Sequence, residues 1–289
     1  MQPLIWDRRP DGLRAPAMIC AFQGWNDAGD AASGAVSFLA SELEADRFAQ
    51  VDIEEFYDFQ TNRPKIELSE EKREITWPTV EMLEARAPRA HRDLVLVQGV
   101  EPSLKWMTFS KLIVDLADAL GVQLVVTVGA LLADIPHSHP VAMTGSASDP
   151  AMLERLSLPP STYDGVTGIV GVVHNACAEA GLPSASIWAS VPHYVAAAPN
   201  PKATLALVRK LEGLVGVTVD ASELEQASSE YERQVGLAVQ SDPDIQAFVE
   251  RLERAAESER EQLDPEELPS GESLAREFQR FLRQRGDGR

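Results

Sequence analysis

Apolar residues in the first 215 positions form short continuous runs that alternate with amphipathic stretches. The continuous runs have the length and character of strands buried on both faces. We expect strands at residues 17–22, 51–57, 94–97, 123–128, 141–144 and 184–191. The amphipathic stretches repeat their apolar residues at helical spacing. We expect helices from the first turn to residue 43 and at residues 105–120, 172–180 and 202–214.

A β-hairpin is predicted by the two short stretches 65–68 and 73–77, which are separated by the polar residues 69–72. Strands that alternate with helices favour a sheet covered on both faces. The predicted fold class is therefore α/β, with a mainly parallel or mixed central sheet flanked by helices.

The pattern changes after residue 215. Apolar residues recur at helical spacing through 224–235 and 245–252, with Asp242-Pro243 between the two stretches. A charged linker is expected at 263–271 and a last amphipathic helix at 274–282. From residue 220 onward there are 18 acidic and 9 basic residues. We predict an α/β domain at 1–215 and an acidic helical extension at 216–289.

The turn after the first strand is the first candidate site. It contains Gly24, Trp25, Asn26, Asp27 and Asp30, followed by a helix rich in Ala and Gly. Asn26 or Asp27 can accept the unpaired backbone N–H groups at the start of that helix. The small residues indicate a close approach of another backbone. The turn is therefore either a capped, tightly packed helix start or a polar ligand-binding mouth.

A phosphate group is disfavoured at this first turn. Helix N-termini attract anions, but Asp27 and Asp30 already supply negative charge there. The spacing of the glycines fits neither the dinucleotide fingerprint nor the P-loop. A cation, an amine or a hydroxyl-rich group is the expected ligand.

The second candidate site is the segment 131–140, which follows the most apolar predicted strand. Asp134, His137 and His139 are residue types that bind zinc or iron. His137 with Asp134 or Asp149 could instead form a general base. The alternative is that these side chains satisfy the polar groups of the loop. Two histidines and one acidic residue are a weak metal-binding signal without a further clear ligand. We therefore predict neither a metal nor another cofactor.

The third candidate site is the turn Thr167-Gly168-Ile169-Val170-Gly171, which has the pattern of a strand-to-helix junction. It has no acidic residue near its start, so it is better suited to an anion than the first turn is. The hydroxyl-rich segment 144–150 contains no G-x-S-x-G motif. We interpret that segment as a turn followed by a helix N-cap.

Composition and charge exclude several classes of function. The chain has 289 residues, a formal net charge of −19 and two cysteines. The negative charge argues against binding to nucleic acid or to an anionic membrane surface. Two cysteines are too few for a disulfide framework. The N-terminal residues lack the apolar segment of a signal peptide, and we expect a cytoplasmic protein.

Four stretches of the sequence resemble the proteasome assembly chaperone family, in its bacterial branch of uncharacterised members. They are residues 22–29, residues 131–140 together with Thr144-Gly145-Ser146, residues 167–171, and residues 190–194. The resemblance covers roughly the first 215 residues. No single stretch is specific to the family, but the four stretches together are specific to it.

The resemblance implies a fold like that of nucleoside phosphorylases and assembly into homo-oligomers. Eukaryotic members of the family help to build the α-ring of the proteasome, and some archaeal members bind proteasome-related partners. Bacterial members have also been labelled as ATP-dependent carboxylate–amine ligases.

Two features of the sequence differ from the family pattern. Archaeal relatives that dock on the proteasome end in a hydrophobic residue, a tyrosine and any third residue, whereas this sequence ends in Gly286-Asp287-Gly288-Arg289. His139 stands where the family more often has arginine, which weakens an anion-binding role for that loop at neutral pH.

The predicted function is therefore that of a homo-oligomeric binding or assembly protein, with a trimer as the expected oligomer. The helical tail is the expected surface for a protein partner. The alternative is an enzyme that acts on a small polar substrate, of the nucleoside-phosphorylase or the ATP-dependent ligase type. Either function requires the three candidate turns to meet at one edge of the sheet.

Overall fold

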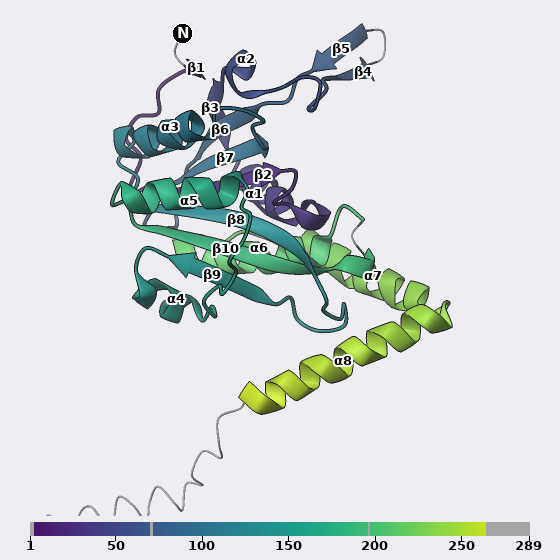
Figure 1. The fold of residues 1–289 in the computed structure, drawn as a ribbon. Helices are drawn as coiled ribbons and strands as arrows, with labels where there is room; N and C mark the ends of the chain where they lie inside the picture. The colour runs from purple at the N-terminus through teal and green to yellow at the C-terminus, as the bar shows by residue number, and fades with distance from the viewer. Residues whose placement is uncertain (1–2, 70–71, 196, 264–289) are drawn as a thin grey trace, which may run out of the picture.

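The computed structural model describes residues 3–69, 72–195 and 197–263, and its centre is an eight-stranded sheet (Figure 1). The order of the strands across this sheet is β1-β3-β6-β7-β2-β8-β10-β9. The strands are β1 (Leu4–Trp6), β2 (Ala17–Gln23), β3 (Asp46–Val51), β6 (Val80–Ala85), β7 (Leu94–Val100), β8 (Leu124–Ala133), β9 (Met143–Ala147) and β10 (Ser184–Pro192).

The four central strands β7, β2, β8 and β10 run parallel to one another. On one side β6, β3 and β1 continue the sheet by antiparallel pairing, and on the other side β9 pairs antiparallel with β10. The sheet is therefore mixed, and the predicted α/β fold class is confirmed. The parallel strands place their carboxyl ends at a common edge, where ligands bind in open α/β sheets.

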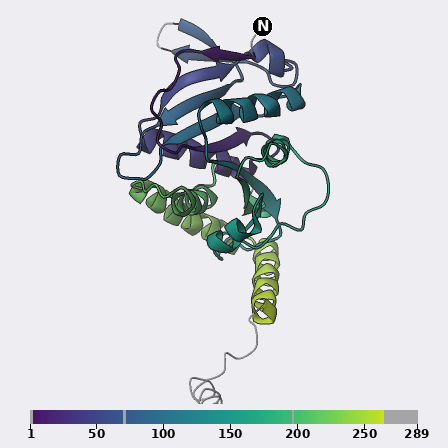
Figure 2. The same cartoon turned by 90° about the vertical axis from the view of Figure 1, so that its left-hand side faces the viewer.

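Helices cover both faces of the sheet (Figures 1 and 2). The helices of the sheet domain are α1 (Ala31–Glu42), α2 (Ile53–Phe56), α3 (Trp106–Ala119), α4 (Pro150–Leu156), α5 (Ile169–Glu179) and α6 (Pro201–Val215). One apolar core lies between the sheet and α1, α4 and α6, and the other lies between the sheet and α3 and α5. In β2, Ile19 faces the first core, whereas Met18 and Cys20 face the second. This alternation follows from the two-residue period of a strand.

The small residues of α1 pack inside the chain. A Cβ atom on Gly34 would lie 3.1 Å from Oγ1 of Thr204 in α6. A Cβ atom on Gly29, whose φ is +63°, would lie 2.8 Å from Cβ of Asn200. The predicted close approach of another backbone is confirmed, and α6 is the element that approaches. Asn200 also caps α6, since its side chain accepts a hydrogen bond from the backbone N–H of Ala203.

The predicted hairpin is also confirmed. Strands β4 (Lys65–Ser69) and β5 (Lys72–Thr76) form a separate antiparallel pair that projects from the body of the molecule (Figure 1). Residues 70–71 of its tip lie outside the described residues. A two-stranded pair without a third strand or a helix behind it is marginally stable in water.

Several sequence-based boundaries are wrong. The strand expected at 51–57 lies at 46–51 instead, because Asp52 accepts a hydrogen bond from the backbone N–H of Glu54 and caps the short helix α2. The helix expected at 172–180 begins three residues earlier, directly after Gly168. The strand expected at 123–128 continues to Ala133, and the strand expected at 141–144 is shifted to Met143–Ala147. Strands β1 and β6 and helix α2 were not predicted.

The first two helices of the tail are α7 (Ser222–Gln240) and α8 (Pro243–Leu263), separated at Asp242 as predicted. Helix α7 packs against α6, and α8 projects away from the sheet (Figures 1 and 2). Val235, Val239 and Val249 form a small apolar cluster, and Tyr194 and Phe248 pack against it. The linker beyond Leu263 and the helix expected at 274–282 lie outside the described residues.

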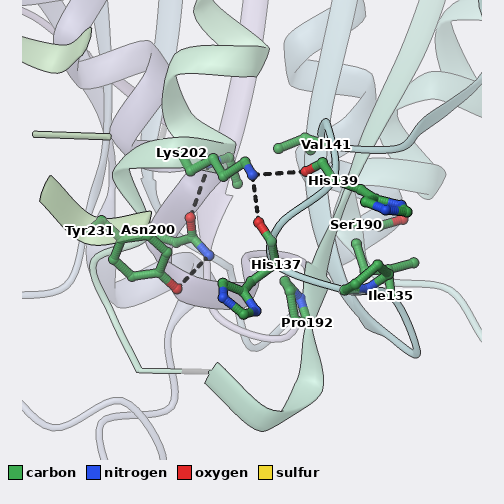
Figure 3. A pocket seen from close by; sticks show the side chains of 11 residues that line it. Ile135, His137, His139, Val141, Ser190, Pro192, Asn200, Lys202 and Tyr231 are labelled. Carbon is green, nitrogen blue, oxygen red and sulfur yellow. Dashed lines mark hydrogen bonds between the residues drawn. The ribbon is translucent and has the colours of Figure 1, made fainter. Parts of the chain in front are cut away.

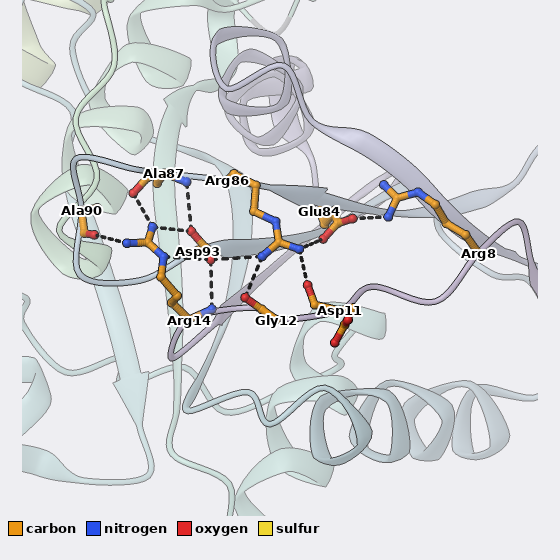
Figure 4. Close-up of polar contacts among 9 residues, drawn as sticks. All are labelled: Arg8, Asp11, Gly12, Arg14, Glu84, Arg86, Ala87, Ala90 and Asp93. Atoms are coloured by element: carbon orange, nitrogen blue, oxygen red, sulfur yellow. Dashed lines mark hydrogen bonds and ion pairs between the residues drawn. The ribbon is translucent and has the colours of Figure 1, made fainter.

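A buried carboxylate ties the segment before β2 to the segment before β7. Asp93 is fully buried, and its Oδ1 lies 2.7 Å from Nη2 of Arg14 while its Oδ2 lies 3.5 Å from Nη1 of Arg86 (Figure 4). It also accepts a hydrogen bond from the backbone N–H of Ala87. Burial alone would raise the pKa of Asp93, but the hydrogen bonds from Arg14 and Ala87 outweigh it and lower the pKa to about 2.

Candidate functional site

The first predicted site is the turn that connects β2 to α1. Asp27 is buried, and its Oδ1 accepts hydrogen bonds from the backbone N–H groups of Ala32 at 2.7 Å and Ser33 at 3.2 Å. Its Oδ2 accepts a hydrogen bond from the hydroxyl of Ser33. Asp27 therefore caps α1, as the sequence predicted. Burial raises the pKa of Asp27, and the hydrogen bonds from Ser33 and Ala32 oppose that shift. Asp30 is exposed at the start of the helix.

Asn26 and Gly168 join the first and third predicted sites directly. Nδ2 of Asn26 donates a hydrogen bond of 2.7 Å to Oε1 of Glu101, which also accepts one of 2.9 Å from the backbone N–H of Ile169. Gly168 precedes that N–H, and a Cβ atom there would lie 2.2 Å from Oδ1 of Asn26. Glycine is therefore required where the two turns meet.

A cavity of about 790 Å³ opens beside this junction. Gly24, Trp25 and Thr167 line it, so the first and third predicted sites share one pocket. The other lining residues include Leu131 and Leu132 at the end of β8. The cavity has the size of a pocket for a small organic ligand.

The floor of this pocket is the part of the sheet face formed by β9 and β10. Ser186 pairs with Ser146 and Trp188 pairs with Thr144, so all four side chains lie on the same face. The indole of Trp188 lies over Gly129, where a Cβ atom would come within 2.6 Å of the ring. The wall opposite the floor comes from α5 and from the loop before it, which contribute His174 and Tyr163.

The second predicted site lies elsewhere. Asp134 pairs with His193, with 2.8 Å between Oδ1 and Nδ1, and not with His137. The hydroxyl of Tyr194 lies 2.7 Å from the backbone N of His137 and 2.9 Å from its Nδ1. Partial burial and the nearby Lys202 lower the pKa of His137.

Lys202 fixes the loop that carries His137 and His139. Its Nζ donates hydrogen bonds to the carbonyl oxygens of His137 at 2.5 Å and His139 at 2.8 Å (Figure 3). It also forms an ion pair with Glu232 of α7. His137, His139 and Lys202 line a cavity of only about 10 Å³. The loop satisfies backbone groups and connects β8 to the tail, which was one of the alternatives left open by the sequence.

The prediction that all three turns meet in one cleft is therefore wrong for Asp134, His137 and His139. Strand β8 runs five residues beyond the predicted end at Val128. At about 3.3 Å per residue, this extension carries the loop roughly 16 Å past the expected edge. Within the described ranges, no three His, Cys, Asp or Glu side chains are grouped as metal ligands would be.

Sequence reasoning did not place Glu101, His174 or the floor residue Ser186 in this region. Glu101 follows directly after β7, so its position at the end of a buried strand was a usable signal. His174 and Ser186 carry no local signal, because the register of β10 and the placement of α5 put them in the pocket.

No helix in the described part of the chain is both long enough and apolar enough to cross a membrane.

The fold and the pocket define an α/β protein with a mixed eight-stranded sheet and a small-molecule-sized cavity that extends from the face of β9 and β10 to the carboxyl ends of β2 and β8. The model of the PAC2 family matches residues 21–239, and the chain belongs to that family. A comparison with curated protein sequences gave no match.

Solved structures agree with this assignment. A PAC2 family protein from Streptomyces avermitilis is 46% identical with a TM-score of 0.75, and the match covers 81% of this chain and 99% of that one. A proteasome-assembly chaperone homologue from Mycobacterium tuberculosis is 41% identical, with the same coverage and TM-score. An archaeal proteasome activator from Pyrococcus furiosus is 16% identical with a TM-score of 0.65, over 81% of this chain and 97% of that one, and it shares the fold.

Proposed function

We propose that this chain is a homo-oligomeric assembly protein that acts in the cytoplasm and binds protein partners. The family, and the description of a 41% identical relative as a proteasome-assembly chaperone homologue, support a role in protein–protein contact. The observation that carries the proposal is the apolar face of the β4–β5 hairpin.

The register of the hairpin places its three large apolar side chains on one face, together with Arg73, which lies opposite Leu68. Ile66 lies directly opposite Ile75, and Leu68 shares their face. The alternate positions on the other face are polar: Lys65, Glu67, Lys72, Glu74 and Thr76. Ile66, Leu68 and Ile75 are 62%, 78% and 55% exposed. An apolar face of this kind on a projecting hairpin is typical of a protein contact site.

A second copy of the chain is the proposed occupant of this face. Leu104 and Met107, at the start of α3, are also exposed and offer an apolar surface on the same chain. A hairpin that docks on the α3 surface of the next subunit makes a head-to-tail contact, which forms a ring where the rotation between subunits closes and an open filament where it does not. We propose the trimer as that ring. The small residues of α1 already pack on α6 within the chain and are not part of the proposed contact.

The double variant Leu68→Gln with Ile75→Gln is expected to be monomeric, because it places polar groups in the middle of the proposed apolar contact. Light scattering after size exclusion measures this directly. The native chain should have three times the 31.5 kDa mass of one chain, and the variant should have that of a single chain.

The matched control is Glu67→Gln with Glu74→Gln, which alters the opposite face of the same hairpin and should leave the mass unchanged. A monomeric native chain would contradict the proposal. A Leu68/Ile75 variant that keeps the native mass and a native-like circular dichroism spectrum would also contradict it.

The acidic helical extension, predicted at 216–289, is the proposed surface for a different protein. Within it, Leu237 of α7 and Ile245 of α8 are exposed apolar residues surrounded in sequence by charged ones. The relatives described as chaperone homologue and activator suggest purified proteasome particles as the first partner to test. Binding of the native chain, and its loss in Leu237→Lys with Ile245→Lys, is the result expected in biolayer interferometry. No binding by the native chain would contradict this partner.

A second candidate function is an enzyme that acts on a small polar substrate. The pocket beside Trp25 favours it, because this cavity has hydroxyl groups on its floor. The lining contains no Lys or Arg side chain, which favours an uncharged substrate over a nucleoside triphosphate. Product formation from an uncharged compound that binds the pocket would support the enzyme.

A further inference from the structure

The pocket between β9, β10 and α5 has an uncharged lining that combines a largely apolar surface with several hydroxyl groups. Its polar side chains are Trp25, Thr144, Ser146, Ser161, Tyr163, Thr167, His174, Ser186 and Trp188, and none of the lining residues is Asp, Glu, Lys or Arg. We propose that this pocket binds an uncharged ligand that carries a flat aromatic ring and hydroxyl groups. The inference concerns binding alone, so it does not depend on the assembly function.

The floor of the pocket supplies hydroxyl groups for hydrogen bonding. Nε1 of Trp188 donates a hydrogen bond of 3.0 Å to Oγ of Ser186, so the Ser186 hydroxyl proton remains available to a ligand acceptor. Thr144 and Ser146 present further hydroxyls on the same face of the sheet. Hydroxyl groups both donate and accept, which matches a ligand whose own polar groups are hydroxyls.

Aromatic side chains supply the apolar part of the binding surface. Trp188 forms part of the floor, while Trp25 and Tyr163 are largely exposed among the lining residues. Flat rings of a ligand stack on such side chains. The exposed Leu131 and Leu132 add aliphatic surface beside them. A ligand with one aromatic and one hydroxyl-bearing part fits both kinds of lining.

His174 indicates where a polar group of the ligand binds. Its Nδ1 is buried and makes no hydrogen bond within the described residues. The imidazole ring lines the pocket, so it can hydrogen-bond a ligand hydroxyl there. Burial lowers the pKa of His174, so the ring is neutral at pH 7 and offers one donor and one acceptor.

The surroundings of the pocket disfavour an anion. Asp27 lies between the lining residues Trp25 and Ala28 in sequence. Glu101 lies beside the pocket, where it accepts a hydrogen bond from the backbone N–H of Ile169. The whole chain carries a net charge of −19. A phosphate or carboxylate in the pocket would lack a cationic partner and would face nearby negative charge.

Isothermal titration with two matched pairs of probes tests the inference. Adenosine is compared with adenosine monophosphate, and phenyl β-glucoside with phenyl β-glucuronide, so that the members of each pair differ in charge. We expect saturable binding of at least one neutral probe and binding of its anionic counterpart that is weaker by about tenfold or more. No saturable binding of either neutral probe, or equal binding of the anionic counterpart, would overturn the proposal.

Two variants locate the bound probe. His174→Ala is expected to weaken binding by about tenfold, because it removes one hydrogen bond to the probe. Ser186→Leu is expected to abolish binding, because the larger side chain occupies space above the floor of the pocket. His91→Ala, at an exposed loop position, is the matched control and should bind as the native chain does. Unchanged binding by both pocket variants would also overturn the proposal.

Light scattering on the same samples separates this inference from the assembly function. Pocket variants that lose the probe but keep the native mass support the inference. A monomeric native chain that still binds the probe contradicts the proposed trimer and leaves the pocket inference supported.

Discussion

Replacement of Gly168 by alanine is expected to lower the free energy of unfolding by roughly 2–4 kcal/mol, because the new methyl group collides with a buried side chain. Its Cβ atom would lie 2.2 Å from Oδ1 and 2.6 Å from Cγ of Asn26. Asn26 is buried and bonded to Glu101, so the whole side chain would have to leave its position. Urea unfolding followed by circular dichroism measures the loss.

Gly213→Ala is the matched control for this prediction. Gly213 lies within α6, and a Cβ atom there has no neighbour within 4 Å. That variant should be as stable as the native chain or up to about 1 kcal/mol more stable, since alanine is the better helix former.

The double variant Gly168→Ala with Asn26→Ala gives the methyl group room and should be less destabilised than the sum of the two single changes. Additive losses, or a Gly168→Ala variant as stable as the native chain, would contradict the described junction of the two turns.

Replacement of Asp93 by alanine is expected to lower the free energy of unfolding by about 3–5 kcal/mol, the usual cost of removing one partner from a buried ion pair. Asp93 is fully buried and accepts hydrogen bonds from the guanidinium of Arg14 and the backbone N–H of Ala87. Without the carboxylate, these donors lose their acceptor. Asp115→Ala is the matched control, because it removes an exposed ion pair with Lys111. It should lower the free energy of unfolding by less than about 1 kcal/mol.

The dependence of this loss on pH gives a sharper test. The pKa of Asp93 is about 2 in the folded chain, below its ordinary value of 3.8. The carboxylate therefore contributes about 2 kcal/mol that is fully present above pH 5 and is lost as the pH falls through 4 toward 2. Asp93→Asn does not titrate, so the difference between it and the native chain should shrink by about 1 kcal/mol from pH 7 to pH 3. A difference that is constant across this range would contradict the lowered pKa.

Much of the fold could be predicted from local pattern. The continuous apolar runs located β2, β7, β8 and β10, which form the parallel centre of the sheet. The helix cap at the end of segment 144–150 was recognisable, because the short polar side chain of Asp149 accepts a backbone N–H group. The capping role of Asp27 was predicted in the same way.

Long-range geometry set the limit of these predictions. Strand β6 was missed because Glu81 and Glu84 interrupt its apolar residues, although Glu84 is buried and pairs with Arg8 and Arg86 across neighbouring segments (Figure 4). The floor of the pocket depends on the register between β9 and β10, which no local pattern encodes.

The central claim is that the apolar face of the β4–β5 hairpin is covered by a second copy of the chain. Two separate variants, Ile66→Cys and Glu67→Cys, place a cysteine on opposite faces of β4. The rate at which each cysteine reacts with a maleimide measures whether its face is covered. The native Cys20 and Cys177 are buried and contribute little background. Above the concentration at which the chain associates, the account predicts that position 66 is protected and position 67 reacts freely. Equal rates at the two positions would contradict the account.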